Sequence, residues 1–159
     1  MLDKYKFLIL LLFALSNFIF PQSYNFKNFS IKEGLPDNFA TSIVQTQNGF
    51  LYISTQNGLS RFDGKNFVNF NKNNGLPANE IEMAIEYKPN NLLLATFNGL
   101  SIFDGETFVN YSKSDGLTSD TLYTLFKYKN KFLIGTKHGI SIFEDNKDRK
   151  STRLNSSHT

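Results

Sequence analysis

The sequence has no cysteine, no tryptophan, two histidines and four prolines among its 159 residues. Without cysteine the chain forms no disulfide and offers neither a thiolate nucleophile nor a thiolate metal site. A metal site would need several convergent histidines, cysteines or carboxylates, and no such spacing is present. We therefore expect no metal, no cofactor and no catalytic residue, and a fold that relies on packing alone.

Charge of one sign is also scarce. The net charge of +3 comes from the ends, because the first six residues contribute +1 and the residues from Asp148 onward contribute +2, which leaves residues 7–147 without net charge. A nucleic-acid-binding domain needs a basic patch in its folded part. We therefore expect no nucleic-acid partner, although the sequence pI is near 9.0.

The longest apolar run is short. FLILLLFALSNFIF, the 14 residues 7–20, follows Lys4 and Lys6 and precedes Pro21. A membrane-spanning helix needs roughly 20 apolar residues, whereas a basic, then apolar, then polar order is typical of a secretory signal. We expect residues 1–23 to form a signal helix that exports the chain; a retained membrane anchor and a buried hydrophobic element are the alternatives.

The other end of the chain departs from the pattern described below. Asp148–His158, DRKSTRLNSSH, resembles the translation of a common sequencing-library adapter. We expect residues 147–159 to be a disordered tail of artificial origin and the natural reading frame to continue. A genuine polar, disordered terminus is the alternative.

What the sequence does have is a repeated phrase. FLYISTQNGLSRFDG at residues 50–64 returns as LLLATFNGLSIFDG at 92–105 and as FLIGTKHGISIFED at 132–145. A fixed period in the range of 20 to 50 residues is typical of arrays, propellers and solenoids. The glycine that opens each unit recurs every 41 residues, at Gly34, Gly75 and Gly116.

Each phrase predicts a β-hairpin, because two apolar runs flank a turn whose glycine tolerates positive φ. Apolar residues on both faces of the strands predict sheets that are covered on both sides. With an inner strand before the hairpin and an aromatic strand after it, each unit has the four short strands of a propeller blade. The turn glycines are Gly58, Gly99 and Gly139, and the inner strands are expected at residues 41–46, 82–87 and 122–128.

We therefore predict an all-β fold, an incomplete β-propeller of about three four-stranded blades over residues 24–146. The blades are expected at 33–73, 74–114 and 115–146, the last with three strands. Residues 24–31, YNFKNFSI, match the end of a unit and are expected to be a stray fourth strand. Because repeat arrays bury their core between neighbours, the last blade is expected to expose an apolar face.

With these phrases, each preceded by GLP or GLT and an aromatic strand, the chain resembles the two-component regulator propeller repeat family. The tryptophan frequent in that family is replaced at Tyr52, Leu93 and Leu133, and its first glycine remains only as Gly135. The resemblance implies a periplasmic or extracellular sensor region that lies ahead of a membrane helix and a histidine kinase or other output domain. It also implies an extracellular ligand such as a glycan fragment.

Polar residues in the connectors are the candidate ligand-binding residues. They precede the inner strands and would lie at one mouth of the central channel, where polar side chains beside aromatic rings suit a sugar. The alternative is that they form Asx-type turns that start each strand. They are Asp37, Asn38, Asn79, Glu80, Ser119 and Asp120.

Two features that resemble catalytic groups are given structural interpretations. His138 stands at the turn position that asparagine takes in the other copies, so we expect a turn residue rather than a base. Glu80, Glu82 and Glu86 are close in sequence, and we expect a solvated edge rather than an acid–base pair.

The predicted function is a non-catalytic sensing module, the N-terminal part of an exported ligand-sensing propeller of a two-component regulator. Its expected partners are an extracellular small molecule or glycan and the remainder of its own chain. Contact with a membrane is expected only through the signal segment or a downstream helix. A secreted propeller enzyme, such as a lyase or glycosidase, and a secreted adhesion or scaffold propeller are the alternatives.

Overall fold

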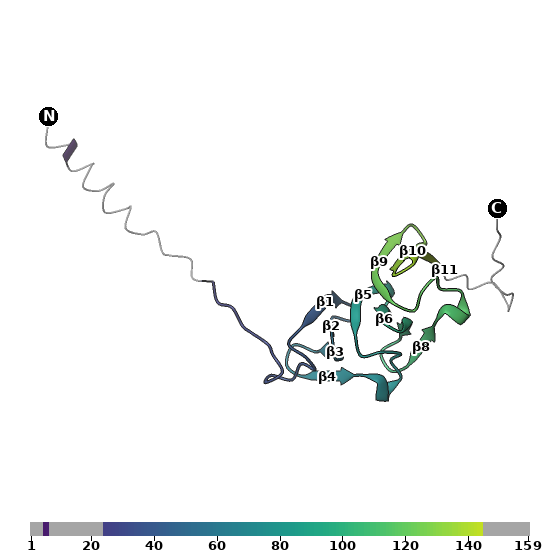
Figure 1. Ribbon diagram of the computed structural model, residues 1–159. Coiled ribbons are helices and arrows are strands. Elements are labelled where there is room, and N and C mark those ends of the chain that lie inside the picture. Colours follow the sequence, from purple (N-terminus) through teal and green to yellow (C-terminus); the bar gives the residue numbers. More distant parts are fainter. Residues whose placement is uncertain (1–4, 7–23, 145–159) are drawn as a thin grey trace.

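The structure, a computed structural model, describes residues 5–6 and 24–144 and folds the second range into three antiparallel sheets (Figure 1). Each sheet is a simple meander in which consecutive strands are neighbours. An all-β architecture of three small sheets in a row confirms the predicted open, incomplete propeller. The signal segment, apart from residues 5–6, and the tail lie outside the described residues.

The sheets and their connectors are called blade 1 (residues 33–73), blade 2 (74–114) and blade 3 (115–144). Blade 1 contains β1 (Ala40–Gln45), β2 (Leu51–Thr55), β3 (Gly58–Phe62) and β4 (Phe67–Phe70). Blade 2 contains β5 (Ile81–Lys88), β6 (Asn91–Thr96), β7 (Gly99–Phe103) and β8 (Phe108–Tyr111). Blade 3 contains β9 (Leu122–Tyr128), β10 (Lys131–Thr136) and β11 (Gly139–Glu144).

The first strands of the three blades follow one another along one side of the molecule, and β4 and β8 lie on the opposite side (Figure 1). β5 contacts both β1 and β9, so the inner strands are the elements through which successive blades meet. One hydrogen bond between the inner strands runs from the Ala84 N–H to the side-chain oxygen Oγ of Ser42, at 2.9 Å. The alignment of inner strands is the arrangement expected around a propeller axis.

The hairpin turns use glycine for a steric reason as well as a conformational one. Gly58 and Gly99 have φ of 125° and 112°. A Cβ on Gly58 would lie 2.4 Å from the carbonyl oxygen of Phe70, and one on Gly99 would lie 2.3 Å from that of Tyr111. The fourth strand of each complete blade can therefore pass close to its hairpin only because the turn residue has no side chain.

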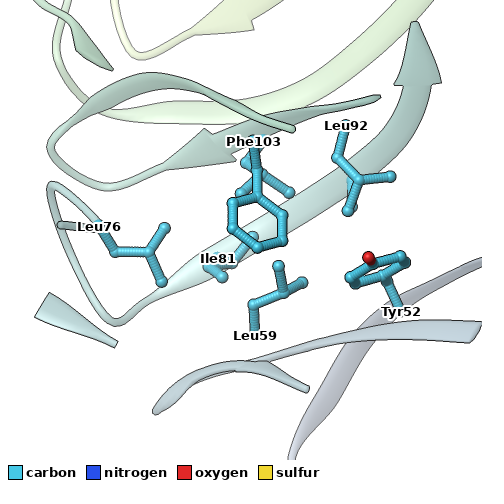
Figure 2. Close-up of a cluster of buried hydrophobic side chains, with 8 residues drawn as sticks. Tyr52, Leu59, Leu76, Ile81, Leu92 and Phe103 are labelled. Atoms are coloured by element: carbon cyan, nitrogen blue, oxygen red, sulfur yellow. The ribbon is translucent and has the colours of Figure 1, made fainter. Parts of the chain in front are cut away.

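The blades are held together by two apolar clusters, one on each face of blade 2. On one face, Tyr52 and Leu59 of blade 1 point toward Leu92 and Phe103 of blade 2 (Figure 2). The Tyr52 and Phe103 rings meet edge to face with centroids 6.1 Å apart. On the other face, Leu93, Ala95 and Leu100 of blade 2 pack against residues of blade 3 that include Leu122, Leu125 and Ile134. Blade 2 is thus covered on both sides, as the two-sided apolar pattern predicts.

Blade 3 exposes the face that points away from blade 2. Phe126, Ile140 and Ile142 are 63%, 64% and 60% exposed. Their counterparts in blade 2, one repeat earlier, are Ile85, Leu100 and Ile102, which pack in the cluster shared with blade 3. The predicted exposed apolar face is therefore present, and it repeats the pattern of a face that is covered elsewhere in the same molecule.

Residues 24–31 differ from their prediction, because they form no strand. Residues 24–30 have no regular secondary structure and residues 31–34 form a turn. A strand is stable only beside a hydrogen-bonding neighbour, and within residues 24–144 no sheet includes this segment.

None of the helices among the described residues has the length and apolar character needed to span a membrane.

Candidate ligand-binding site

Three of the six candidate residues have one shared structural role. Asn38, Asn79 and Asp120 occupy the same position of successive connectors, and each side-chain oxygen accepts the N–H of the residue seven positions earlier. The N···O distances are 3.1, 2.9 and 2.6 Å. These side chains therefore tie the start of each connector to its end, and the sequence alternative, a turn-forming role, describes them.

Two further candidates cap the entry into an inner strand. The N–H of Phe39 donates to Asp37 Oδ1 at 2.8 Å, and the N–H of Thr121 donates to Ser119 Oγ at 3.1 Å. These are the local bonds by which Asp and Ser start a turn. The corresponding residue of blade 2 is Ala78, which has no such group. The bond is therefore an aid to the fold at this position rather than a requirement.

Glu80 is the candidate whose side chain the turn does not require. It is the counterpart of Phe39 and Thr121, and in all three residues the carbonyl oxygen accepts an N–H from a hairpin turn. Because the backbone makes the shared contact, the side chain at this position is free to differ. Phenylalanine, glutamate and threonine occur there, and the turn forms with each of them.

The connectors are closed by capped turns that also hold negative charge. The N–H of Ser30 donates to Glu33, and the N–H of Ser112 donates to Asp115 ahead of the 3₁₀ helix η3 (Lys113–Asp115). The Ser30 hydroxyl and then its N–H hold the pKa of Glu33 below its ordinary value. The Ser112 N–H does the same for the pKa of Asp115. Both carboxylates thus stay ionised at neutral pH as parts of the backbone scaffold.

Exposed aromatic rings lie at the same end of the inner strands as Glu80. Phe97, in the hairpin turn of blade 2, donates its N–H to the Glu80 carbonyl oxygen at 3.2 Å. Its ring meets that of Tyr123 of blade 3 edge to face, with centroids 6.0 Å apart. Phe39 of blade 1 is also exposed at this end. Sequence reasoning expected nearby aromatics but did not name them, since Phe97 and Tyr123 meet only when two blades are placed side by side.

We call Glu80, Glu82, Phe97 and Tyr123 the aromatic–acidic surface. Gln56 of blade 1 donates to Glu82 Oε1 at 3.3 Å, so all three blades contribute to its surroundings. Aromatic rings with a few polar groups are the usual lining of sites for small organic ligands. The surface can therefore offer an apolar contact from two perpendicular rings together with carboxylate acceptors.

Glu86 does not belong to this surface, because its carboxylate bonds to backbone groups of two turns. Its Oε1 accepts the N–H of Gln47 in blade 1 at 3.0 Å and the N–H of Asn90 in blade 2 at 2.7 Å. The carboxylate therefore joins the turns of neighbouring blades. Within residues 5–6 and 24–144, no group of three or more His, Asp or Glu side chains is placed to hold a metal ion.

Part of blade 1 matches the model of a known protein family. Residues 34–57, which run from the first connector to the hairpin turn of blade 1, match the family described as two component regulator propeller. This part of blade 1 is therefore similar to a two-component regulator propeller repeat. No curated protein sequence matches the chain significantly.

Solved structures with the same fold include extracellular domains from B. thetaiotaomicron. The domain of BT3049, assigned as a hybrid two component system, superposes with a TM-score of 0.68 and 22% identity over 74% of this chain and 18% of that chain. The domain of BT4673, also assigned as a hybrid two component system, gives 0.63 and 15% over 85% and 19%. YCF48 bound to D1 peptide gives 0.53 and 16% over 70% and 39%.

These structures share the fold of this chain, which spans about a fifth of the length of the two extracellular domains. The fold that they share with this chain includes the three-sheet arrangement seen in Figure 1. The match in blade 1 contains Asp37 and Asn38, whose side chains bond to the backbone. The matched range therefore covers part of the connector of blade 1 as well as β1 and β2.

Proposed function

We propose that this chain is part of an exported propeller domain that binds an extracellular ligand for a two-component regulator, and that it has no catalytic activity of its own. The observation that carries the proposal is the match of blade 1 to the two-component regulator propeller family within a chain of evenly spaced repeats. The fold shared with extracellular domains of two-component systems supports it.

The aromatic–acidic surface is the proposed contact for the ligand. Phe97 and Tyr123 offer ring faces, and Glu80 and Glu82 offer acceptors for hydroxyl groups. A short oligosaccharide has both apolar ring faces and many hydroxyl donors, so it matches this surface in chemistry. The remainder of the protein's own chain is the proposed second partner, which would complete the ring and carry the signal onward.

The proposal is tested by binding of an oligosaccharide panel to the full 159-residue chain, measured by calorimetry, and then by two variants of β9. Tyr123→Ala is expected to weaken binding at least tenfold, because it removes one of the two rings. Tyr128→Ala is the matched control, since Tyr128 is 53% exposed but lies at the opposite end of the same strand. Equal loss in both variants, or no binding by any oligosaccharide, would contradict a glycan sensor.

The regulatory part of the proposal is tested on the gene. We expect the natural reading frame to continue into more propeller repeats, a membrane helix and an output domain. A natural stop codon shortly after the third repeat would overturn the link to signal transduction, whatever the binding result.

A further inference from the structure

Residues 26–29 have the sequence of a fourth strand but lie in no sheet. Phe26, Asn28 and Phe29 precede Phe67, Asn69 and Phe70 of β4 by 41 residues each. The asparagine matters most, because Asn69 accepts from Ser60 Oγ at 2.6 Å and donates to the Gly34 carbonyl oxygen at 2.9 Å. Asn110 of β8 makes the same two bonds, to Ser101 and Gly75. The segment therefore carries the side chains with which both complete blades fasten their last strand.

Phe29 already lies where a fourth-strand aromatic residue lies beside the next blade. Its ring centroid is 5.2 Å from that of Phe62 and 5.5 Å from that of Phe67. One repeat later, Phe70 makes the equivalent contacts with Phe103 and Phe108, at 4.8 and 6.2 Å. Phe29 is thus positioned on blade 1 in the way that Phe70 of β4 is positioned on blade 2.

Blade 3 has the converse feature, a place for a fourth strand that no described residue fills. A Cβ on Gly139 would meet nothing within 4 Å, whereas the equivalent atoms on Gly58 and Gly99 would strike the last strand of their blades. Ser141, the counterpart of Ser60 and Ser101, instead accepts the N–H of Thr118 at 3.0 Å. Within the described range, the exposed edge of β11 is therefore ready to pair with one more strand.

These two features do not meet within one molecule. Phe29 packs on blade 1, and β5 of blade 2 separates the inner strands of blades 1 and 3.

The outer face of blade 1 and the outer face of blade 3 are both apolar and could pack on each other between two copies. Ile43, which is 67% exposed on blade 1, is the counterpart of Ala84 and Leu125, and these two residues pack against the preceding blade. Blade 3 presents Phe126 and Ile142 on its open face.

We propose that the 159-residue chain associates head to tail, with residues 26–29 of one copy added as the fourth strand of blade 3 in a second copy. The contact repeats the one between successive blades and uses two different surfaces, so it is heterologous and can continue from copy to copy. In a longer chain with further blades, those blades would compete for the same surfaces. The test therefore uses the 159-residue chain.

The register of the added strand follows from β3 and β4, which pair antiparallel from Leu59 with Phe70 to Phe62 with Phe67. Transferred by the repeat, the pairs across the two copies are Ile140 with Phe29, Ser141 with Asn28, Ile142 with Lys27 and Phe143 with Phe26. Asn28 then accepts from the Ser141 hydroxyl and donates to the Gly116 carbonyl oxygen of the second copy. Phe26, which is 87% exposed, would then pair with Phe143 of the second copy as Phe67 pairs with Phe62.

The first test uses two variants that each block one side of the contact. Ile142→Lys places a charge opposite Lys27, and Asn28→Pro removes a strand N–H. We expect the unaltered chain to sediment as a multiple of 18.2 kDa and each variant alone to sediment as a single 18.2 kDa chain. An equal mixture of the two is expected to form a dimer, because one intact contact remains. Val109→Lys, at an exposed position of blade 2, is the control and should associate like the unaltered chain.

A single-chain mass for the unaltered protein would overturn the proposal. So would association of either blocked variant alone, which would indicate another surface, or a mixture that stays monomeric.

The second test examines the register and uses the absence of native cysteine. Mixing Lys27→Cys with Ile142→Cys under mild oxidation is expected to give a disulfide-linked dimer at least tenfold faster than mixing Asn28→Cys with Ile142→Cys. The reason is that a shift of one residue places the second thiol on the opposite face of the strand. Equal rates for the two mixtures would contradict the proposed strand addition even if the chains associate.

Discussion

Blades 2 and 3 have nearly the same sequence pattern but very different surroundings. Leu100 of blade 2 is fully buried, whereas its counterpart Ile140 in blade 3 is 64% exposed. The difference comes from neighbours, because blade 2 has a sheet packed on each face and blade 3 has one on a single face. The apolar residues of a blade therefore form a core only together with the neighbouring blades. The same substitution should therefore have different effects in the two blades.

The largest difference is expected at the aromatic residue near the end of the third strand. Phe103 is fully buried in the cluster of Figure 2, whereas Phe143 is half-buried. Phe103→Ala is expected to lower the free energy of unfolding by about 3–5 kcal/mol and Phe143→Ala by about 1–2 kcal/mol. Urea denaturation measures both.

If Phe103→Ala does not fold, Phe103→Leu provides the smaller change for comparison with Phe143→Leu. Equal losses in the two blades would show that the stack does not determine the contribution of this residue.

The hairpin glycines offer a second comparison, with a steric cause. Gly99 and Gly139 have nearly the same φ, 112° and 111°, but only at Gly99 would a Cβ meet another strand. Gly139→Ala should cost about 1–2 kcal/mol for the unfavourable φ alone. Gly99→Ala should cost about 2–4 kcal/mol, because the collision with the Tyr111 carbonyl is added. Thermal unfolding of the two variants under the same conditions would show whether the fourth strand accounts for the difference.

The sequence predicted the blades well because a repeated pattern carries its own check. Three copies of one phrase place their hairpins and inner strands independently, and β9 coincides with its predicted range of residues 122–128. The strand predicted at residues 24–31 did not form, since its pattern gives the strand propensity but not the neighbour it needs. What a side chain contacts across blades, as Glu86 does, depends on the rotation between sheets, and no local pattern states it.

The candidate site shows the same limit in detail. The connectors could be recognised as polar loops, but the bond from Lys72 N–H to Asn79 spans a turn whose closure is visible only in three dimensions. The same is true of the contact between Phe97 and Tyr123, which come from different blades. Sequence reasoning therefore named polar residues of the connectors but not the contacts that their side chains make between and within blades.

A smaller effect, of opposite sign, is expected from two buried serines of blade 1. Ser54 and Ser60 are both fully buried. The Ser60 hydroxyl donates to Asn69, whereas the Ser54 hydroxyl has no hydrogen-bond partner among the described residues. Ala95 stands at the position of Ser54 in blade 2. Ser54→Ala is expected to raise the free energy of unfolding by about 1 kcal/mol, because it removes a buried hydroxyl without a partner. Ser60→Ala should lower it by about 1 kcal/mol, and urea denaturation of the pair gives both signs in one experiment.

The smallest effect concerns acid. Asp104, in the turn before β8, accepts the backbone N–H groups of Thr107 and Glu106 at 2.7 and 2.9 Å, which hold its pKa below the ordinary value of 3.8. A carboxylate with a lowered folded-state pKa stabilises the fold above its unfolded pKa, and this contribution is lost as the pH falls through the lower folded value. Blade 3 has Glu144 at the corresponding position, at the end of β11.

We therefore expect the unaltered chain to lose more stability between pH 7 and pH 3 than Asp104→Ala does, by less than about 1 kcal/mol because solvent screens this exposed turn. Glu144→Ala is the matched comparison. Its effect should be independent of the Asp104 turn, so the double variant should show the sum of the two single changes. Parallel pH profiles for the unaltered chain and Asp104→Ala would show that the pKa of Asp104 is the same in the folded and the unfolded chain. The Asp104 turn would then contribute nothing to the acid response of blade 2.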